Sequence, residues 1–351
     1  MRNLIPLAVR ALTMVGVFFV VLLLLVLTLG LTGFSDRILS SVVGEQIRVE
    51  RTTLAETIRD PDELERVLAA RKAELESFYG LDIPWQRRLP GTVFRVMRLD
   101  LGEARSLRSF AGSSRIADIV LERLPNTILL MTTSTVIVAL TGLAGGLYVA
   151  TRPGSWIDRL VSGLAAVTYA IPTWWIGILL ILVVSVHWRL LPSGGMYSTP
   201  PPEGGWLRFA DLARHAVLPV LSMVLVSVGP YMYGVRTITL NIAQEDFVGM
   251  ARARGLSETR VRNAHILRVA APPIVTGLIF GLAGSLSGSI LIETVFNWQG
   301  MGRLYYDALA GTPDEGVIVA LTFMFTLMYV AIRLLLETLY IFLDPRVSYA
   351  D

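Results

Sequence analysis

The side chains that could perform chemistry are few in this sequence and lie far apart. There is no cysteine, so neither a disulfide nor a thiolate metal site can form. The three histidines, His187, His215 and His265, are too widely separated to suggest a histidine metal cluster. No serine–histidine, paired-aspartate or histidine–glutamate set lies in the apolar segments, which argues against an intramembrane enzyme. We therefore predict no catalytic residue and no metal site.

The single lysine excludes one further kind of chemistry. A nucleotide-binding P-loop needs the pattern G-x-x-x-x-G-K-[ST], in which the lysine reaches the phosphates. Lys72 lies instead in Arg71-Lys72-Ala73-Glu74, with no glycine-rich loop before it. The chain is therefore not a P-loop ATPase. If it is part of an active transporter, another polypeptide must supply the energy for transport.

The stretch from 236 to 270 has the pattern of a short, charged helical element. Gln244 to Arg254 predicts a helix whose positive N-terminal end is matched by Glu245 and Asp246. Helical spacing places four side chains on one face: Phe247, Met250, Ala251 and Arg254. This face combines apolar and cationic groups, which suits contact with another surface.

A second helix is predicted directly after the first. Gly255 ends the first helix, and Ser257 caps a second one that carries Arg260, Arg262 and Arg268. One interpretation is an interfacial helix whose arginines lie on lipid phosphates. The other is a docking element inserted into the cleft of a partner, because the small Ala251 and Ala253 allow close approach.

The elements that must position this loop are membrane spans. Hydrophobic residues make up 53% of the 351 residues and charged residues only 17%, against about 25% in soluble proteins. Long windows carry no charge at all, as the bilayer core requires. We predict an all-α membrane protein with six transmembrane helices, close to Ala11–Ser35, Thr127–Ala150, Leu160–Val186, Ala216–Val235, Ala271–Ile292 and Val317–Tyr340. The first run is longer than the apolar region of a secretory signal, so we expect it to be retained.

Between the first two spans lies a charged insert, residues 36–115. Asp60-Pro61-Asp62-Glu63 predicts a helix start, and Gly80 its end. This amphipathic helix is expected to pack on the rest of the insert. The predicted organisation is thus 1–35 for the N-terminus and first span, 36–115 for an extracytoplasmic insert, and 116–351 for the core domain with its 236–270 loop.

Arginine placement sets the predicted orientation. The N-terminus, the 151–159 loop, the 236–270 loop and the C-terminal tail hold more arginine than the opposite short loops, 187–213 and 293–316, which indicates that both termini are cytoplasmic. The net charge of +3 does not indicate nucleic acid binding, because the arginines flank apolar segments rather than forming one basic tract.

The spans from Thr127 to Ile292 contain no ionisable residue. Carriers coupled to protons or sodium place such groups inside the membrane, so their absence argues against a secondary carrier or channel. That alternative stays open because a coupling ion can bind backbone carbonyls. A scaffold that binds a soluble partner through the insert is another alternative.

Several motifs resemble one transporter family. Gly249-Met250-Ala251-Arg252-Ala253-Arg254-Gly255 is similar to the EAA loop of ABC importer permeases, in the form found in the oligopeptide/dipeptide/nickel subfamily. The order and spacing of other segments also resemble that subfamily, among them Tyr79 to Pro84, Glu122 to Thr127, Gly154 to Arg159, Ile171 to Trp175, Leu191 to Gly195, His215 to Pro219 and Asp344 to Arg346.

The resemblance implies an ABC type I importer permease in a bacterial or archaeal inner membrane. It implies a second, homologous permease subunit, an extracytoplasmic solute-binding protein and two ATPase subunits that bind ATP and Mg, with no cofactor in this chain. The implied ATPase-coupling residues are Glu245, Asp246, Gly249, Met250, Ala251, Arg252, Arg254 and Gly255. Gly249 stands at the usual glutamate position, so an acidic contact there is lost or is supplied by Glu245 or Asp246. Peptides are the default substrate by resemblance alone.

Residues for the pathway or for helix packing are predicted in two spans. The fifth span carries small residues on one face, including Gly281, Gly284, Ser285 and Gly288. Such a face allows close helix packing, and its serines would otherwise line a polar passage. Pro172 should kink the third span beside Trp174 and Trp175, which either gate the pathway or mark the membrane interface.

Overall fold

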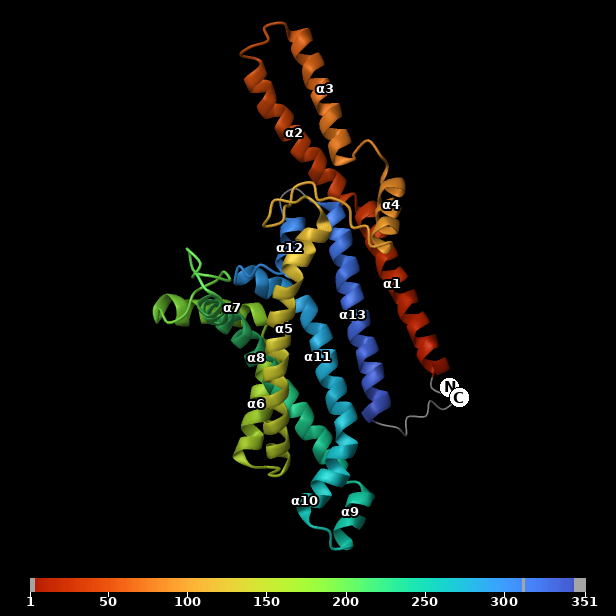
Figure 1. Ribbon diagram of the computed structural model, residues 1–351, viewed down its shortest axis with the longest axis vertical. Coiled ribbons are helices and arrows are strands. Elements are labelled where there is room, and N and C mark those ends of the chain that lie inside the picture. The colour runs from red at the N-terminus through yellow and green to blue at the C-terminus, as the bar shows by residue number, and fades with distance from the viewer. Residues whose placement is uncertain (1–3, 311–312, 344–351) are drawn as a thin grey trace. The chain divides into compact units, whose positions relative to one another are not determined.

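The computed structural model describes residues 4–310 and 313–343 (Figure 1). Among these residues the regular structure is helical, and the only β pairing is an isolated bridge between Glu103 and Arg115. The chain forms two compact units. One consists mainly of residues 124–303, and the other of residues 10–123 and 304–328. The all-α architecture is as predicted.

Most of the predicted spans coincide with long helices. They are α1 (Leu4–Thr32), α5 (Ile116–Ala150), α8 (Gly205–Ala243), α11 (Leu267–Val295) and α13 (Glu315–Leu343). Within the described residues, α5, α8, the helical run Glu258–Gly281 that enters α11, and α13 are long and apolar enough to cross a membrane. The helix α1 ends at Thr32, three residues before the predicted end of the first span at Ser35, and has an ionisable residue only at Arg10.

The third predicted span is not one helix. It consists of α6 (Trp156–Ala170), α7 (Thr173–Leu180) and the π-helical turn η1 (Ile181–His187), with a bend of 98° between α6 and the following pair. Pro172 has no N–H to donate, and Ile171 before it takes an extended backbone. The predicted kink is therefore a sharp break in the segment.

Glycines let the helices of residues 124–303 approach each other closely. A Cβ at Gly229 of α8 would meet the backbone of Ala165 in α6. A Cβ at Gly146 of α5 would overlap Val235 of α8. The core beside these contacts is formed by large buried side chains: Leu130, Met196, Leu218, Met223, Ile292, Phe296 and Trp298. Close packing of this kind is the main source of helix association in lipid.

The insert contains a helical hairpin of α2 (Phe34–Leu54) and α3 (Pro61–Tyr79), followed by α4 (Trp85–Met97). The predicted start and end of α3 are confirmed. The Asp60 carboxylate accepts a hydrogen bond from the Asp62 N–H at 3.0 Å, and Gly80 ends the helix with a φ of +72°. Leu39, Val43 and Tyr79 form the apolar core of the hairpin.

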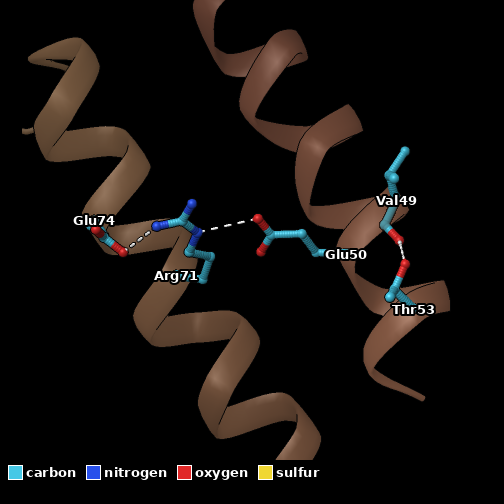
Figure 2. Close-up of polar contacts among 5 residues, drawn as sticks. All are labelled: Val49, Glu50, Thr53, Arg71 and Glu74. Atoms are coloured by element: carbon cyan, nitrogen blue, oxygen red, sulfur yellow. Dashed lines mark hydrogen bonds and ion pairs between the residues drawn. The ribbon is translucent and has the colours of Figure 1, made fainter. Parts of the chain in front are cut away.

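Charged side chains join the two helices of the hairpin (Figure 2). The Arg71 guanidinium of α3 donates to Glu50 of α2 at 3.2 Å and to Glu74 of its own helix at 2.5 Å. These hydrogen bonds, with Glu74 the larger contributor, raise the pKa of Arg71 above its ordinary value. Because these side chains are largely exposed, their contribution to stability is small.

The loop after α4 is tied to the start of α13. The buried Asp314 carboxylate accepts from the backbone N–H groups of Arg105 at 2.6 Å and Ser106 at 3.1 Å. The same side chain lies beside the first turn of α13, which follows α12 (Met301–Leu309). Within the second unit, the insert is therefore anchored to residues near the C-terminal span.

Candidate functional site

The loop between α8 and the run that enters α11, which we term the 244–266 loop, folds as two short helical segments. The first is α9 (Asp246–Ala253), with Glu245 at the N-cap in an extended conformation and Asp246 in the first turn. An acidic side chain there is favourable beside the positive end of the helix. Gln244 still belongs to the end of α8, because its N–H donates to the Asn241 carbonyl. The helix therefore begins two residues later than predicted.

Gly255 ends α9 in the manner that its position predicted. It has a φ of +76°, and its N–H donates to the Arg252 carbonyl at 2.9 Å. The next N–H, of Leu256, donates to the Ala251 carbonyl at 3.4 Å. These two bonds define a Schellman motif, which satisfies the last carbonyls of the helix and turns the chain sharply.

The second segment differs in part from the prediction. Ser257 occupies the N-cap position of α10 (Glu258–Arg260), but its side chain makes no capping hydrogen bond. The Ser257 carbonyl instead accepts from the Val261 N–H at 2.9 Å. The chain then continues as the π-helical turn η2 (Val261–Ile266) into α11, so the second helix is longer than a separate loop helix would be.

The 244–266 loop has its own small apolar core. Val248, Ala251, Val261 and Ile266 are buried together, with Ile242, Ala243 and Leu256 packed against them. Ala251, predicted on the exposed face, is therefore an internal packing residue. A loop with a core holds its surface residues in fixed positions, as a docking element must.

The surface of α9 is partly apolar and partly cationic. Phe247 is 37% exposed and Met250 58% exposed. Gly249 is open, since a Cβ placed there meets nothing within 4 Å. Arg254 is exposed and forms no ion pair with any residue that the structure describes.

Arg252 has a different place from Arg254. Its Nε donates to the Glu258 carboxylate at 3.0 Å, and its Nη1 lies 3.5 Å from the Ala243 carbonyl. It therefore links α9 to the last residue of α8 and to the first residue of α10. The two arginines of the motif are structurally distinct, one holding the loop together and the other left at its surface.

A buried ion pair connects α8 to α6 near this loop. Arg236 donates from Nε and Nη2 to the two oxygens of Asp158, at 2.8 and 2.7 Å. Asp158 also accepts from the Gly154 N–H at 2.8 Å, so its charge is well satisfied. From the sequence, Arg236 counts only as a topology signal, because nothing in a linear sequence pairs residues 158 and 236.

A second buried carboxylate lies at the far end of α11. Glu293, which is fully buried, accepts from the Thr127 hydroxyl at 2.8 Å and from the Arg303 N–H at 2.9 Å. The Thr127 oxygen in turn accepts from the Met301 N–H at 2.8 Å. This network fixes the turn after α11 against α5. The network is not predicted from the sequence, in which Glu293 stands one residue beyond the predicted span.

A cavity of about 440 Å³ lies between α5, α6, α8 and α11. Hydroxyl groups contribute to its lining, from Ser134, Thr135, Thr168, Tyr169, Ser227 and Tyr231. Among the described residues that line it, none carries a charge. It is a mostly apolar site with a few polar groups, as is usual for small-solute sites.

The predicted pathway residues are only partly brought together here. Gly281 lines the cavity, whereas the partly exposed Trp174 and Trp175 of α7 are not among its lining residues. Gly284, Ser285 and Gly288 lie in α11, outside the part of the chain whose side chains the structure describes. The lining residues from α5 and α8 carry no motif and were not predicted.

Comparison with known proteins defines the class. The family model for the binding-protein-dependent transport system inner membrane component matches residues 142–349. The oligopeptide transport system permease protein AppB of Bacillus subtilis is 34% identical over 67% of this chain and 72% of its own length. The dipeptide transport system permease protein DppB of Escherichia coli is 31% identical over 80% of this chain and 86% of its own.

The chain belongs to the family of binding-protein-dependent transport system inner membrane components. The inward-facing MetNI methionine ABC transporter has a similar fold, with a TM-score of 0.52 at 17% identity over 66% of this chain and 99% of that chain. The protein is therefore a membrane-embedded ABC importer permease, which works with an ATPase and a solute-binding protein. Its lack of a P-loop agrees with the separate ATPase subunit of such importers.

Proposed function

We propose that this chain forms one half of the translocation path of a peptide importer. The peptide substrate is supported by the names of the relatives AppB and DppB, both permeases of peptide transport systems. A second, homologous permease would complete the path. Two ATPase subunits would bind on the cytoplasmic side and a solute-binding protein on the extracytoplasmic side. Lipid surrounds the pair, and no nucleic acid takes part.

The proposed orientation places both termini and the 244–266 loop in the cytoplasm and the 36–115 insert outside. The exposed face of α9, with Phe247, Met250 and Arg254, is the observation that carries the proposal. This face is held in place by the internal core of the loop and by the Schellman motif, so a movement of α9 moves the whole 244–266 loop. Glu245, Asp246 and Gly249 are also exposed, at the N-cap and on the surface of α9.

The buried ion pair gives a route from this loop into the core. ATP-driven closure of the ATPase subunits moves α9 and with it the end of α8, which Arg236 joins to Asp158 of α6. The helices that wall the 440 Å³ cavity then move as rigid bodies and alternate its access between the two sides. ATP and Mg belong to the partner subunits in this scheme.

Substituting Gly249 by leucine tests the proposal. The position is open and helical, so the added side chain leaves the loop folded but occupies space that a docked partner would need. We expect Gly249→Leu to reduce co-purification of the ATPase subunits and to abolish ATP-dependent uptake. Gly44→Leu is the matched control, since Gly44 of α2 is also helical and open.

Two results would contradict the proposal. If ATPase co-purification and uptake are unchanged in Gly249→Leu, α9 does not form the contact with the ATPase subunits. Solute flux without ATP, in vesicles that contain only this chain, would instead support the alternative of a secondary carrier or channel.

A further inference from the structure

Two of the motifs that resemble the family meet at a cleft with no role in the proposed mechanism. Leu191 and Pro192 come from the segment after η1, and His215 from α8. They line a cleft of about 280 Å³, together with Arg189, Arg214 and two serines. This cleft is separate from the 440 Å³ cavity, with which it shares no lining residue.

The cleft has two exposed guanidinium groups, of which Arg189 has no partner among the described residues and Arg214 lies within range of the Asp211 charge. Arg189 makes no hydrogen bond or ion pair with any residue that the structure describes, and its backbone has a φ of +55°. Arg214 donates to the Leu190 carbonyl at 3.2 Å, a neutral acceptor. A non-glycine residue in the left-handed region is uncommon and often marks a functional position.

The acidic side chain beside the cleft is already engaged. Asp211 accepts from the N–H and the hydroxyl of Ser198, at 2.7 and 2.8 Å. Its carboxylate also lies 3.4 Å from the His215 ring nitrogen Nδ1, which is 2.8 Å from the Asp211 carbonyl. Asp211 therefore orders Ser198 and His215, and it interacts with Arg214 through charge alone, because no hydrogen bond or ion pair joins the two among the described residues.

The loop that presents these groups is fixed in place. The Gly195 N–H donates to the Phe296 carbonyl at 2.8 Å, and Gly194 is so close to Phe296 that a Cβ would overlap its backbone. Phe296 is buried in the main core. The backbone that follows Arg189 is thus anchored to the core, and Arg214 is held by α8, so little backbone ordering is needed when a ligand binds.

We propose that this cleft binds a carboxylate, and specifically the C-terminal carboxylate of a peptide. The planar guanidinium group matches a carboxylate through paired hydrogen bonds. The cleft is smaller than the 300–1,000 Å³ typical of pockets for whole drug-sized ligands, so it suits one end of a solute. The identity of the ligand as a peptide rests on the proposed function.

The test compares tri-alanine with tri-alanine amide, which lacks the terminal charge. Binding of both peptides is measured by equilibrium dialysis to the complete permease–ATPase complex in phosphatidylcholine nanodiscs, without binding protein. We expect tri-alanine to bind and Arg189→Asn to weaken its binding about tenfold, with no change for the amide. Asparagine suits the test because it tolerates the left-handed backbone at this position.

Arg208→Asn is the matched control. Arg208 lies in α8, as Arg214 does, with its guanidinium carbon 4.9 Å from the centre of the Tyr197 ring, but it does not line the cleft. We expect it to bind tri-alanine as the wild type does. Equal binding of acid and amide by the wild type, or no loss with Arg189→Asn, would overturn the inference. So would competition by inorganic phosphate but not by acetate, which would assign the cleft to phosphate groups.

A second measurement separates this inference from the proposed function. ATP-dependent uptake of tri-alanine is followed in vesicles that contain the complex and its binding protein. Uptake by the wild type together with unaltered binding by Arg189→Asn would overturn the carboxylate site alone. Absence of peptide uptake by the wild type would instead count against the peptide importer.

Discussion

Replacing Asp158 by asparagine should destabilise the packed pair α6–α8 by about 2–4 kcal/mol, because it leaves the Arg236 guanidinium without its counter-charge. Removing one partner of a buried ion pair costs about 3–5 kcal/mol. The Asp158 side chain is 6% exposed and that of Arg236 21% exposed, so partial hydration of the arginine lowers the expected loss. The Gly154 N–H can still donate to the asparagine carbonyl oxygen.

A double-mutant cycle measures the pair itself. Asp158→Asn, Arg236→Gln and the double variant are unfolded reversibly in mixed dodecylmaltoside–SDS micelles, with far-UV circular dichroism as the readout. We expect the double variant to lose at least about 1 kcal/mol less than the sum of the single losses, because the two side chains act on each other. Arg159→Gln is the control, since Arg159 is exposed beside the pair. Additive losses within about 0.5 kcal/mol would refute the coupling of α6 and α8 through this contact.

Three further substitutions test the local structure. Gly300→Ala should destabilise the protein by about 1–3 kcal/mol in the same unfolding assay, because a Cβ would overlap the buried Glu293 carboxylate; a neutral effect would contradict the packing of that turn. Gly255→Ala should cost about 1 kcal/mol, because its φ is +76°, and should raise hydrogen exchange in α9; unchanged exchange would contradict the role of the Schellman turn. Asp60→Ala should cost about 1 kcal/mol through loss of the N-cap and speed proteolysis at the start of α3, while Gly44→Ala, at an open helical position, should not.

The sequence predicted best those features that depend on neighbouring residues. The N-cap at Asp60 and the helix ends at Gly80 and Gly255 are local consequences of side-chain capping and left-handed backbone, and all three are confirmed. The cap at Ser257 is the exception, since its side chain makes no capping hydrogen bond and the chain continues into a π-helical turn. Apolar run length likewise predicted the long helices.

Features that depend on distant residues could not be predicted in this way. Asp158 and Arg236, like Thr127 and Glu293, are joined only by the packing of separate helices. A single sequence shows each as an isolated polar residue near a membrane boundary. The break at Pro172 was visible as a kink, but its angle depends on how α6 and α7 pack, which the proline alone does not set.

The exposed face of α9 likewise combines a feature that the local sequence predicts with one that it does not. Helical spacing placed Phe247, Met250, Ala251 and Arg254 on one face, yet Ala251 is buried in the core of the 244–266 loop. The period of a helix gives the direction of each side chain but not which neighbour covers it. The contact of this face with an ATPase remains a prediction from the proposed function.

The most direct measurement of that contact uses the absence of cysteine from the chain. A single cysteine introduced by Met250→Cys is labelled with a benzophenone maleimide in membranes that contain the complete importer, and illuminated. We expect a covalent adduct with the ATPase subunit, and little adduct from Asn263→Cys, an exposed position on η2 of the same loop. Adducts of Met250→Cys with lipid alone, in membranes that transport solute, would contradict that contact.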